Sequence, residues 1–196
     1  MYTKLSKAVG AWLAKENVID VNESELYAYA FYSLLFGLTP IFISIILGIM
    51  FHMLKEALIL IIPFMVMRKF SGGFHLKRPG TCLICSTLLL AFSLCVIKYI
   101  SRFQQSSTLK SLVLISALII FLLSPIDSEE RKLSLSEKKT FGLISKVLIV
   151  LFIIIYFISF FYTPINISAS IGMGIVLVAF LQLPCLIKMM SQNLRS

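Results

Sequence analysis

The chain alternates between long apolar runs and short polar segments. Six apolar runs can be separated, and each approaches the roughly 17 to 25 residues that a helix needs to cross a bilayer. Their bounds are Tyr27–Leu47, Phe51–Met67, Cys82–Ile100, Ser111–Ile126, Phe141–Thr163 and Ile165–Ile187, and Gly48 marks a turn after the first. The pattern predicts an all-α, polytopic helical membrane protein. The second and fourth runs are short enough to be either re-entrant or fully spanning.

The N-terminal segment, residues 3–26, differs from these runs. Over residues 3–17, Leu5, Val9 and Trp12 recur at helical spacing, while Lys4 and Lys7 provide cations for lipid headgroups. We therefore expect an amphipathic helix lying in the membrane interface. The segment lacks an uninterrupted apolar core followed by a small-residue cleavage site, so a removable signal peptide is not expected.

Composition places the chain outside the soluble class. Mean hydropathy is +0.96 and only 14% of residues are charged, whereas about a quarter are charged in soluble domains. Residues 1–196 leave room for one domain. The net charge of +9 does not indicate a nucleic-acid partner, because cytoplasmic loops of membrane proteins are rich in Lys and Arg. An acidic partner at the membrane surface is the other interpretation of this charge.

The basic residues also predict an orientation in the plasma membrane. If both termini are cytoplasmic, fourteen of the 18 Lys and Arg residues lie inside, in agreement with the positive-inside rule. Only Lys55, Lys98, Arg102 and Lys110 then lie outside. The polar segment 68–82 and the basic connector 127–140 both face the cytoplasm in this orientation.

The segment Arg68–Cys85, RKFSGGFHLKRPGTCLIC, holds the densest polar chemistry. Pro79 and Gly80 favour a loop that leads into a helix beginning near Thr81, with Cys82 in its first turn. The helix dipole, with Lys77 and Arg78, favours the thiolate. His75 can take the thiol proton and return it to a leaving amine. Gly72 and Gly73 allow a tight turn whose N–H groups could bind an oxyanion. This arrangement is that of a cysteine peptidase.

Other interpretations compete with this one. The Cys-x-x-Cys pattern of Cys82 and Cys85 allows a redox role, but the βαβ setting of thioredoxin-like motifs is missing. Cys85 is expected to be buried, and the four cysteines to be mostly small packing residues. A peptide transporter would use spans broken by Pro40, Pro63 and Pro184, but no intramembrane charge or repeat supports it. Small residues such as Gly172 suit helix packing or dimerisation. No metal or cofactor is expected.

The order Arg68, Gly72-Gly73-x-His75, six residues and then Cys82 resembles the accessory gene regulator protein B (AgrB) family of quorum sensing. The chain length, the six apolar runs, the amphipathic N-terminus and the connector SPIDSEERKL are also similar. The resemblance implies a membrane endopeptidase that acts as a homodimer. Such proteins cut the C-terminal side of a precursor peptide, AgrD, and hold the upstream part as a thioester. They then support its cyclisation to a thiolactone or lactone.

By matching position, the resemblance implies that Cys82 is the nucleophile and His75 its partner; it gives no third residue that orients the histidine. AgrD-type precursors carry an amphipathic leader and an acidic tail. We expect this tail to bind eight basic residues of the cytoplasmic face, namely Arg68, Lys69, Lys77, Arg78, Arg131, Lys132, Lys138 and Lys139.

Overall fold

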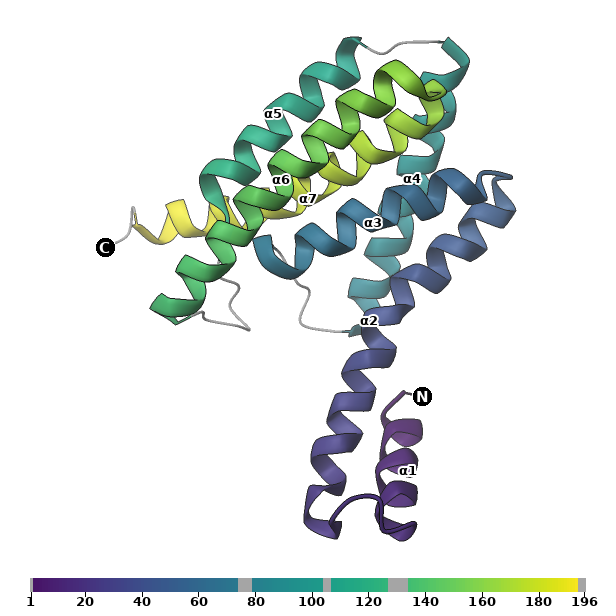
Figure 1. The fold of residues 1–196 in the computed structure, drawn as a ribbon, viewed down its shortest axis with the longest axis vertical. Helices are drawn as coiled ribbons and strands as arrows, with labels where there is room; N and C mark the ends of the chain where they lie inside the picture. The colour runs from purple at the N-terminus through teal and green to yellow at the C-terminus, as the bar shows by residue number, and fades with distance from the viewer. Residues whose placement is uncertain (1, 74–78, 104–106, 127–133, 194–196) are drawn as a thin grey trace. The chain divides into compact units, whose positions relative to one another are not determined.

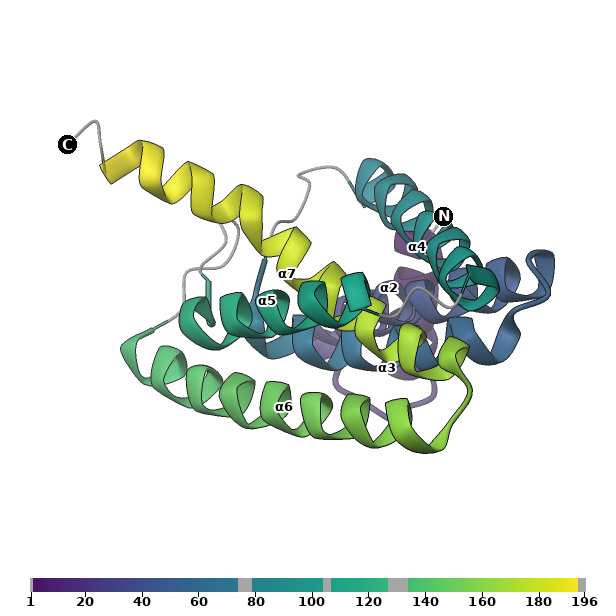
Figure 2. The same ribbon diagram turned by 90° about the horizontal axis from the view of Figure 1, so that it is seen from above.

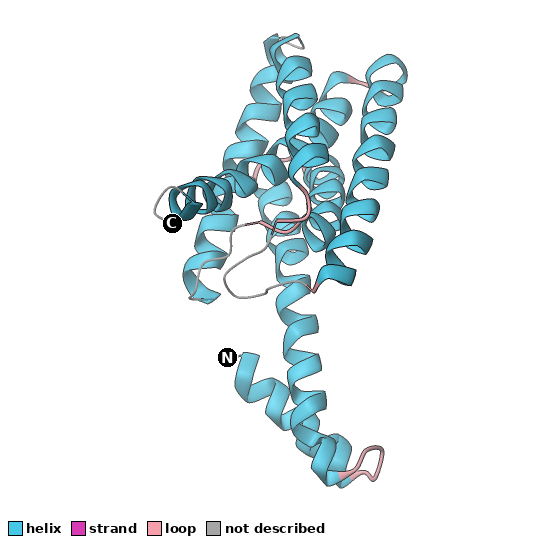
Figure 3. Ribbon diagram, turned by 90° about the vertical axis from the view of Figure 1, so that its left-hand side faces the viewer, coloured by secondary structure: helices cyan, strands magenta, loops and turns pink. Residues whose placement is uncertain are grey.

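The structure, a computed structural model, describes residues 2–73, 79–103, 107–126 and 134–193 (Figure 1). These residues form helices and no β-strand, as Figure 3 shows. The helices are α1 (Tyr2–Lys15), α2 (Ser24–Met50), α3 (Leu54–Ser71), α4 (Pro79–Phe103), α5 (Ser107–Leu123), α6 (Leu135–Tyr162) and α7 (Ile165–Asn193), with a 3₁₀ turn at Val21–Glu23. The all-α prediction is confirmed.

Four of these helices, α2, α4, α6 and α7, are long and apolar enough to cross a membrane. Helix α5 is apolar but shorter, and α3 carries charged residues at both ends, including Glu56 and Arg68. A helical membrane protein is therefore confirmed, while the crossing of α3 and α5 stays a prediction. The predicted turn at Gly48 is wrong, because α2 continues through it. Gly48 instead permits close packing, since a Cβ there would lie 2.9 Å from the Leu54 Cα.

The chain divides into two compact units, residues 1–43 and 44–196. The first contains α1, the 3₁₀ turn and most of α2. Gly10 of α1 packs closely on α2, because a Cβ at that position would lie 3.1 Å from the Ala28 Cβ. The predicted N-terminal helix is present, and its location in the membrane interface stays a prediction. The proposal of one domain over residues 1–196 likewise stays a prediction.

Helix α7 is the centre of the second unit, where it contacts α3, α4, α5 and α6 (Figure 2). Its apolar stretch is 61% buried, against 22% for α4 and 28% for α6, whose remaining apolar surface suits lipid. Small residues permit the close approach of its neighbours. A Cβ at Gly174 would lie 2.7 Å from the Leu60 carbonyl oxygen, and one at Gly172 would lie 2.8 Å from Val113. The small-residue face thus serves packing within the chain.

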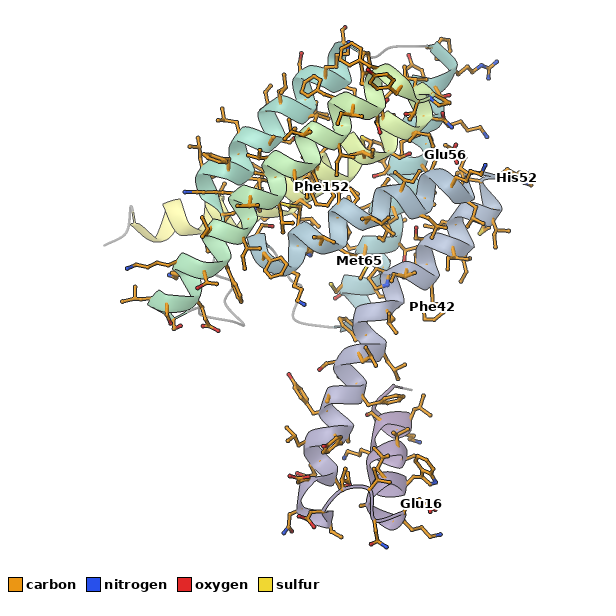
Figure 4. All side chains as sticks on the ribbon, in the orientation of Figure 1. Glu16, Phe42, His52, Glu56, Met65 and Phe152 are labelled. Carbon is orange, nitrogen blue, oxygen red and sulfur yellow. The ribbon has the colours of Figure 1, made fainter. Side chains whose placement is uncertain are left out.

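The second unit has two ends with different contacts. At the distal end, where α3, α5 and α7 begin, Asn166 donates a hydrogen bond to Glu56, and Lys110 Nζ lies 3.7 Å from the centre of the Phe160 ring. Glu56 and His52 are labelled there in Figure 4. At the opposite end, here called the Cys82 end, α3 and α5 end and α4 and α6 begin. The helices therefore alternate in direction, as the predicted topology requires.

Candidate active site

Cys82 is the fourth residue of α4 and lies in its first turn. The helix begins at Pro79, two residues before the predicted start at Thr81, since proline is favoured at a first helical position. Cys82 is half-buried and forms no disulfide. The first turn of α4 contains no acidic residue. The sulfur therefore lies at the positive end of the helix dipole.

The other three cysteines are more exposed than expected for packing residues. Cys85 and Cys95 are exposed and Cys185 is half-buried. Cys85 and Cys95 lie on α4, whose apolar stretch is largely exposed within the protein, so they face the surroundings and not a core. The prediction that Cys85 is buried is wrong.

Among the residues that the structure describes, Arg68 is a cation that interacts electrostatically with Cys82. It lies in the last turn of α3, outside the four long apolar helices. Burial lowers the pKa of the Arg68 guanidinium below its usual value, and electrostatic interaction with Cys82 and Cys185 offsets this only in part. Arginine stays protonated even so. Helices α3, α4 and α7 thus place one cation beside two thiols.

Gly72 and Gly73 form the turn that follows α3. Their φ angles of 74° and 134° lie in the region that favours glycine. A Cβ at Gly72 would collide with the Ile126 carbonyl oxygen, and one at Gly73 would lie 2.8 Å from Arg68 Nη1 and 3.3 Å from the Leu181 carbonyl oxygen. The turn therefore lies directly against the Arg68 side chain and against α7. These close approaches require glycine at both positions. The sequence alone did not reveal this requirement.

A buried polar network holds this turn, and sequence analysis missed its members. Gln182 of α7 is fully buried, and its Nε2 donates to the Ser71 carbonyl oxygen at 3.2 Å and to Ser124 Oγ at 2.9 Å. The Ile126 N–H donates to the same Ser71 carbonyl oxygen at 3.1 Å. We call these four residues the Gln182 network. The only signal for it in the sequence is an amide side chain inside an apolar run.

The beginning of α6 completes the Cys82 end. The Phe141 ring meets the Phe70 ring of α3 edge-on at 5.9 Å, and a Cβ at Gly142 would lie 3.2 Å from Pro125. Ser134 caps α6, with Glu137 closing a capping box. Lys138 and Lys139 follow in the next positions, so the start of α6 adds basic residues near the end of α3.

The predicted site residues are thus partly located. Arg68, Lys69, Gly72, Gly73, Cys82, Lys138 and Lys139 lie at the Cys82 end. Lys69 is exposed there, with its Nζ 5.6 Å from the Phe70 ring centre. His75, Lys77, Arg78, Arg131 and Lys132 lie outside the described residues.

The chain is similar to one known protein family and to two proteins of Clostridium perfringens. The model of the family described as Accessory gene regulator B (AgrB) matches residues 6–183. An AgrB-like protein 2 of Clostridium perfringens strain 13 is 27% identical over 147 residues, which are 71% of this chain and 67% of the relative. An AgrB-like protein of C. perfringens strain SM101 matches to the same extent. No solved structure matches the chain.

Proposed function

The chain belongs to the accessory gene regulator B family, a membrane protein family of quorum sensing, and we propose that it is a cysteine endopeptidase and peptide cyclase. Its substrate is an AgrD-like precursor, from which it removes an acidic C-terminal tail. One observation carries the proposal, namely that Cys82 lies in the first turn of α4, within electrostatic reach of the half-buried Arg68 cation. Both features place positive charge near the sulfur that must become negative to attack.

The reaction begins when the Cys82 thiol gives its proton to His75. The sulfur attacks the carbonyl carbon of the scissile peptide bond, and backbone N–H groups near Gly72 and Gly73 bind the oxyanion. The C–N bond then breaks, and His75 returns the proton to the nitrogen of the departing tail. The upstream peptide is left as a thioester on Cys82. A thiol or hydroxyl of the peptide attacks this thioester, closes the ring and releases the Cys82 thiol.

Ring closure requires that the thioester survive until the peptide attacks itself. A site at the edge of the hydrocarbon layer holds little bulk water and keeps the two reacting ends close, which favours cyclisation over hydrolysis. The exposed apolar side chains that flank Cys82 along α4, Ile84 and Leu88, support such a position. We propose that the Cys82 end and both termini face the cytoplasm, and that the protein acts as a homodimer in the cell membrane.

The experiment is to co-reconstitute the protein in vesicles with an AgrD-type precursor that has an amphipathic leader, one cysteine and an acidic tail. Cys82→Ala and His75→Ala are expected to abolish cleavage while the protein accumulates normally. The matched control is Cys85→Ala, one turn further along the same helix, which is expected to cleave normally. A precursor mimic with an electrophilic carbonyl at the cleavage site should label Cys82 alone. Continued cleavage by Cys82→Ala would favour a transporter function.

A further inference from the structure

Gln182 joins three segments that are far apart in the sequence. Its side chain projects from α7 and donates one hydrogen bond to the last residue of α3, Ser71, and one to the residue after the end of α5, Ser124. The residue separations are 111 and 58. Both bonds are buried, so water cannot replace them without entering the protein.

The bond to Ser71 acts at the point where the chain leaves α3. The last carbonyl groups of a helix lack partners within the helix. The Ser71 carbonyl finds two elsewhere, the Gln182 amide and the Ile126 N–H. The next residue, Gly72, pairs with Ile126. The direction in which the chain continues from Ser71 is therefore determined jointly by α7 and by the segment after α5.

We propose that Gln182 is a positioning residue for the processing reaction, and this inference rests on the proposed function. By holding the Ser71 carbonyl, it fixes the Gly72–Gly73 turn against α7 and against the Arg68 guanidinium. His75 follows Gly73 by two residues, so their Cα atoms are at most about 7 Å apart. If the turn moves, the proposed base His75 and the Arg68 cation move with it relative to Cys82.

The chemistry of Gln182 supports positioning over packing. A buried amide destabilises the fold unless its polar atoms are bonded, and an apolar side chain of similar size would fill the same space. Moreover, the Oε1 atom of Gln182 has no hydrogen-bond partner among the residues that the structure describes. A buried amide with an unbonded oxygen stabilises the fold less than an apolar side chain would, so stability alone does not explain Gln182. What the amide provides is the direction of its two N–H bonds.

The test uses the full-length protein and the reconstituted precursor assay. Gln182→Met removes both donors at nearly constant volume. If the turn shifts by about 1 Å, kcat should fall by roughly 10- to 100-fold with KM little changed. Ser124→Ala removes one acceptor and should give a smaller fall in kcat. The double variant should be no slower than Gln182→Met, because both changes remove the same bond.

The matched control is Ser170→Ala on the same helix. Ser170 is equally buried, but among the described residues its hydroxyl donates only to the Asn166 carbonyl of α7 itself, at 2.7 Å. This variant should keep the wild-type kcat. A wild-type kcat for Gln182→Met, a raised KM in place of a lowered kcat, or additive effects in the double variant would overturn the inference.

If the Gln182→Met protein does not accumulate, the Ser124→Ala variant tests the inference, because it leaves α7 unchanged. A wild-type kcat for Ser124→Ala would then overturn the inference. The proposed function fails by a different result, namely cleavage by Cys82→Ala. Loss of cleavage in Cys82→Ala together with wild-type kinetics in Gln182→Met rejects the positioning role alone.

Discussion

The two ends of the second unit both connect helices through polar groups, but the connections differ in kind. At the distal end, side chains meet side chains, as in the Asn166–Glu56 hydrogen bond and the Lys110–Phe160 cation–π contact. Glu56 and Asn166 are only half-buried. At the Cys82 end, the fully buried Gln182 amide binds the backbone at Ser71.

This difference has a physical consequence. Water can partly replace a half-buried side-chain contact, so its loss lowers stability by about 1 kcal/mol and leaves the backbone in place. A buried backbone carbonyl that loses its donor has no such substitute, and the chain must shift or remain unsatisfied. Substitutions at the distal end should therefore affect stability alone. Those at the Cys82 end should affect peptide processing more than stability.

Outside the proposed catalytic pair Cys82 and His75, the largest effect should come from Gly72→Ala. The φ and ψ angles of Gly72, 74° and −159°, lie in a region populated almost only by glycine, and other residues are strained there by about 1 to 3 kcal/mol. The new Cβ would also collide with the Ile126 carbonyl oxygen. We expect the free energy of unfolding to fall by about 2 kcal/mol and cleavage to fall by roughly 100-fold. Thermal unfolding in detergent and the cleavage assay measure the two effects.

Gly80→Ala is the control for this substitution. Gly80 lies in the first turn of α4, two residues from Cys82, and a Cβ there would meet no atom of the described residues within 4 Å. Alanine favours a helix over glycine by up to about 1 kcal/mol, so stability should stay equal or rise. If Gly72→Ala cleaves the precursor as well as Gly80→Ala does, the Gly72–Gly73 turn is not part of the site.

The sequence predicted the helices well, because uninterrupted apolar runs leave few alternatives to helices in a membrane. It also placed Cys82 in the first turn of a helix, since Pro79 and Gly80 mark that start locally. The roles proposed for Cys82 and His75 stay predictions. Gly48 was misinterpreted for a related reason: glycine signals both turns and close packing, and only the position of Leu54 distinguishes the two.

The Gln182 network could not be predicted in the same way. Its bonds join residues 58 and 111 positions apart, and no local pattern determines such pairs. The prediction that Cys85 is buried failed for a similar reason. Cys85 occupies an apolar run, but an apolar residue in a membrane helix can face lipid as well as neighbouring helices. Which side it faces depends on how α4 packs on α7.

A smaller effect is expected from charge reversal at the start of α6. Lys138→Glu with Lys139→Glu replaces two cations of the Cys82 end by anions, which should repel an acidic tail. We expect KM to rise about tenfold at low ionic strength and much less at 0.5 M salt, where the Debye length is only about 4 Å. Acidic residues suit the first turn of a helix, so folding should not be impaired. Steady-state kinetics at several salt concentrations provide the measurement.

The matched control reverses two cations at the distal end. Lys98→Glu with Arg102→Glu changes the net charge by the same amount on exposed residues near the end of α4. If the tail binds at the Cys82 end, KM should stay at the wild-type value. Equal changes in KM for the two double variants would show that net charge, and not a local tail site, governs binding.

The smallest effect on processing should come from Asn166→Ala, the distal counterpart of the Gln182 substitution. It removes the hydrogen bond to Glu56, and the free energy of unfolding should fall by about 1 kcal/mol because a carboxylate accepts that bond in a half-buried position. Thermal unfolding should detect this change, while kcat and KM stay at wild-type values. A fall in kcat comparable to that of Gln182→Met would mean that the two ends are coupled through α7. In that case the long central helix, and not the local network around Ser71, would determine the geometry near Cys82.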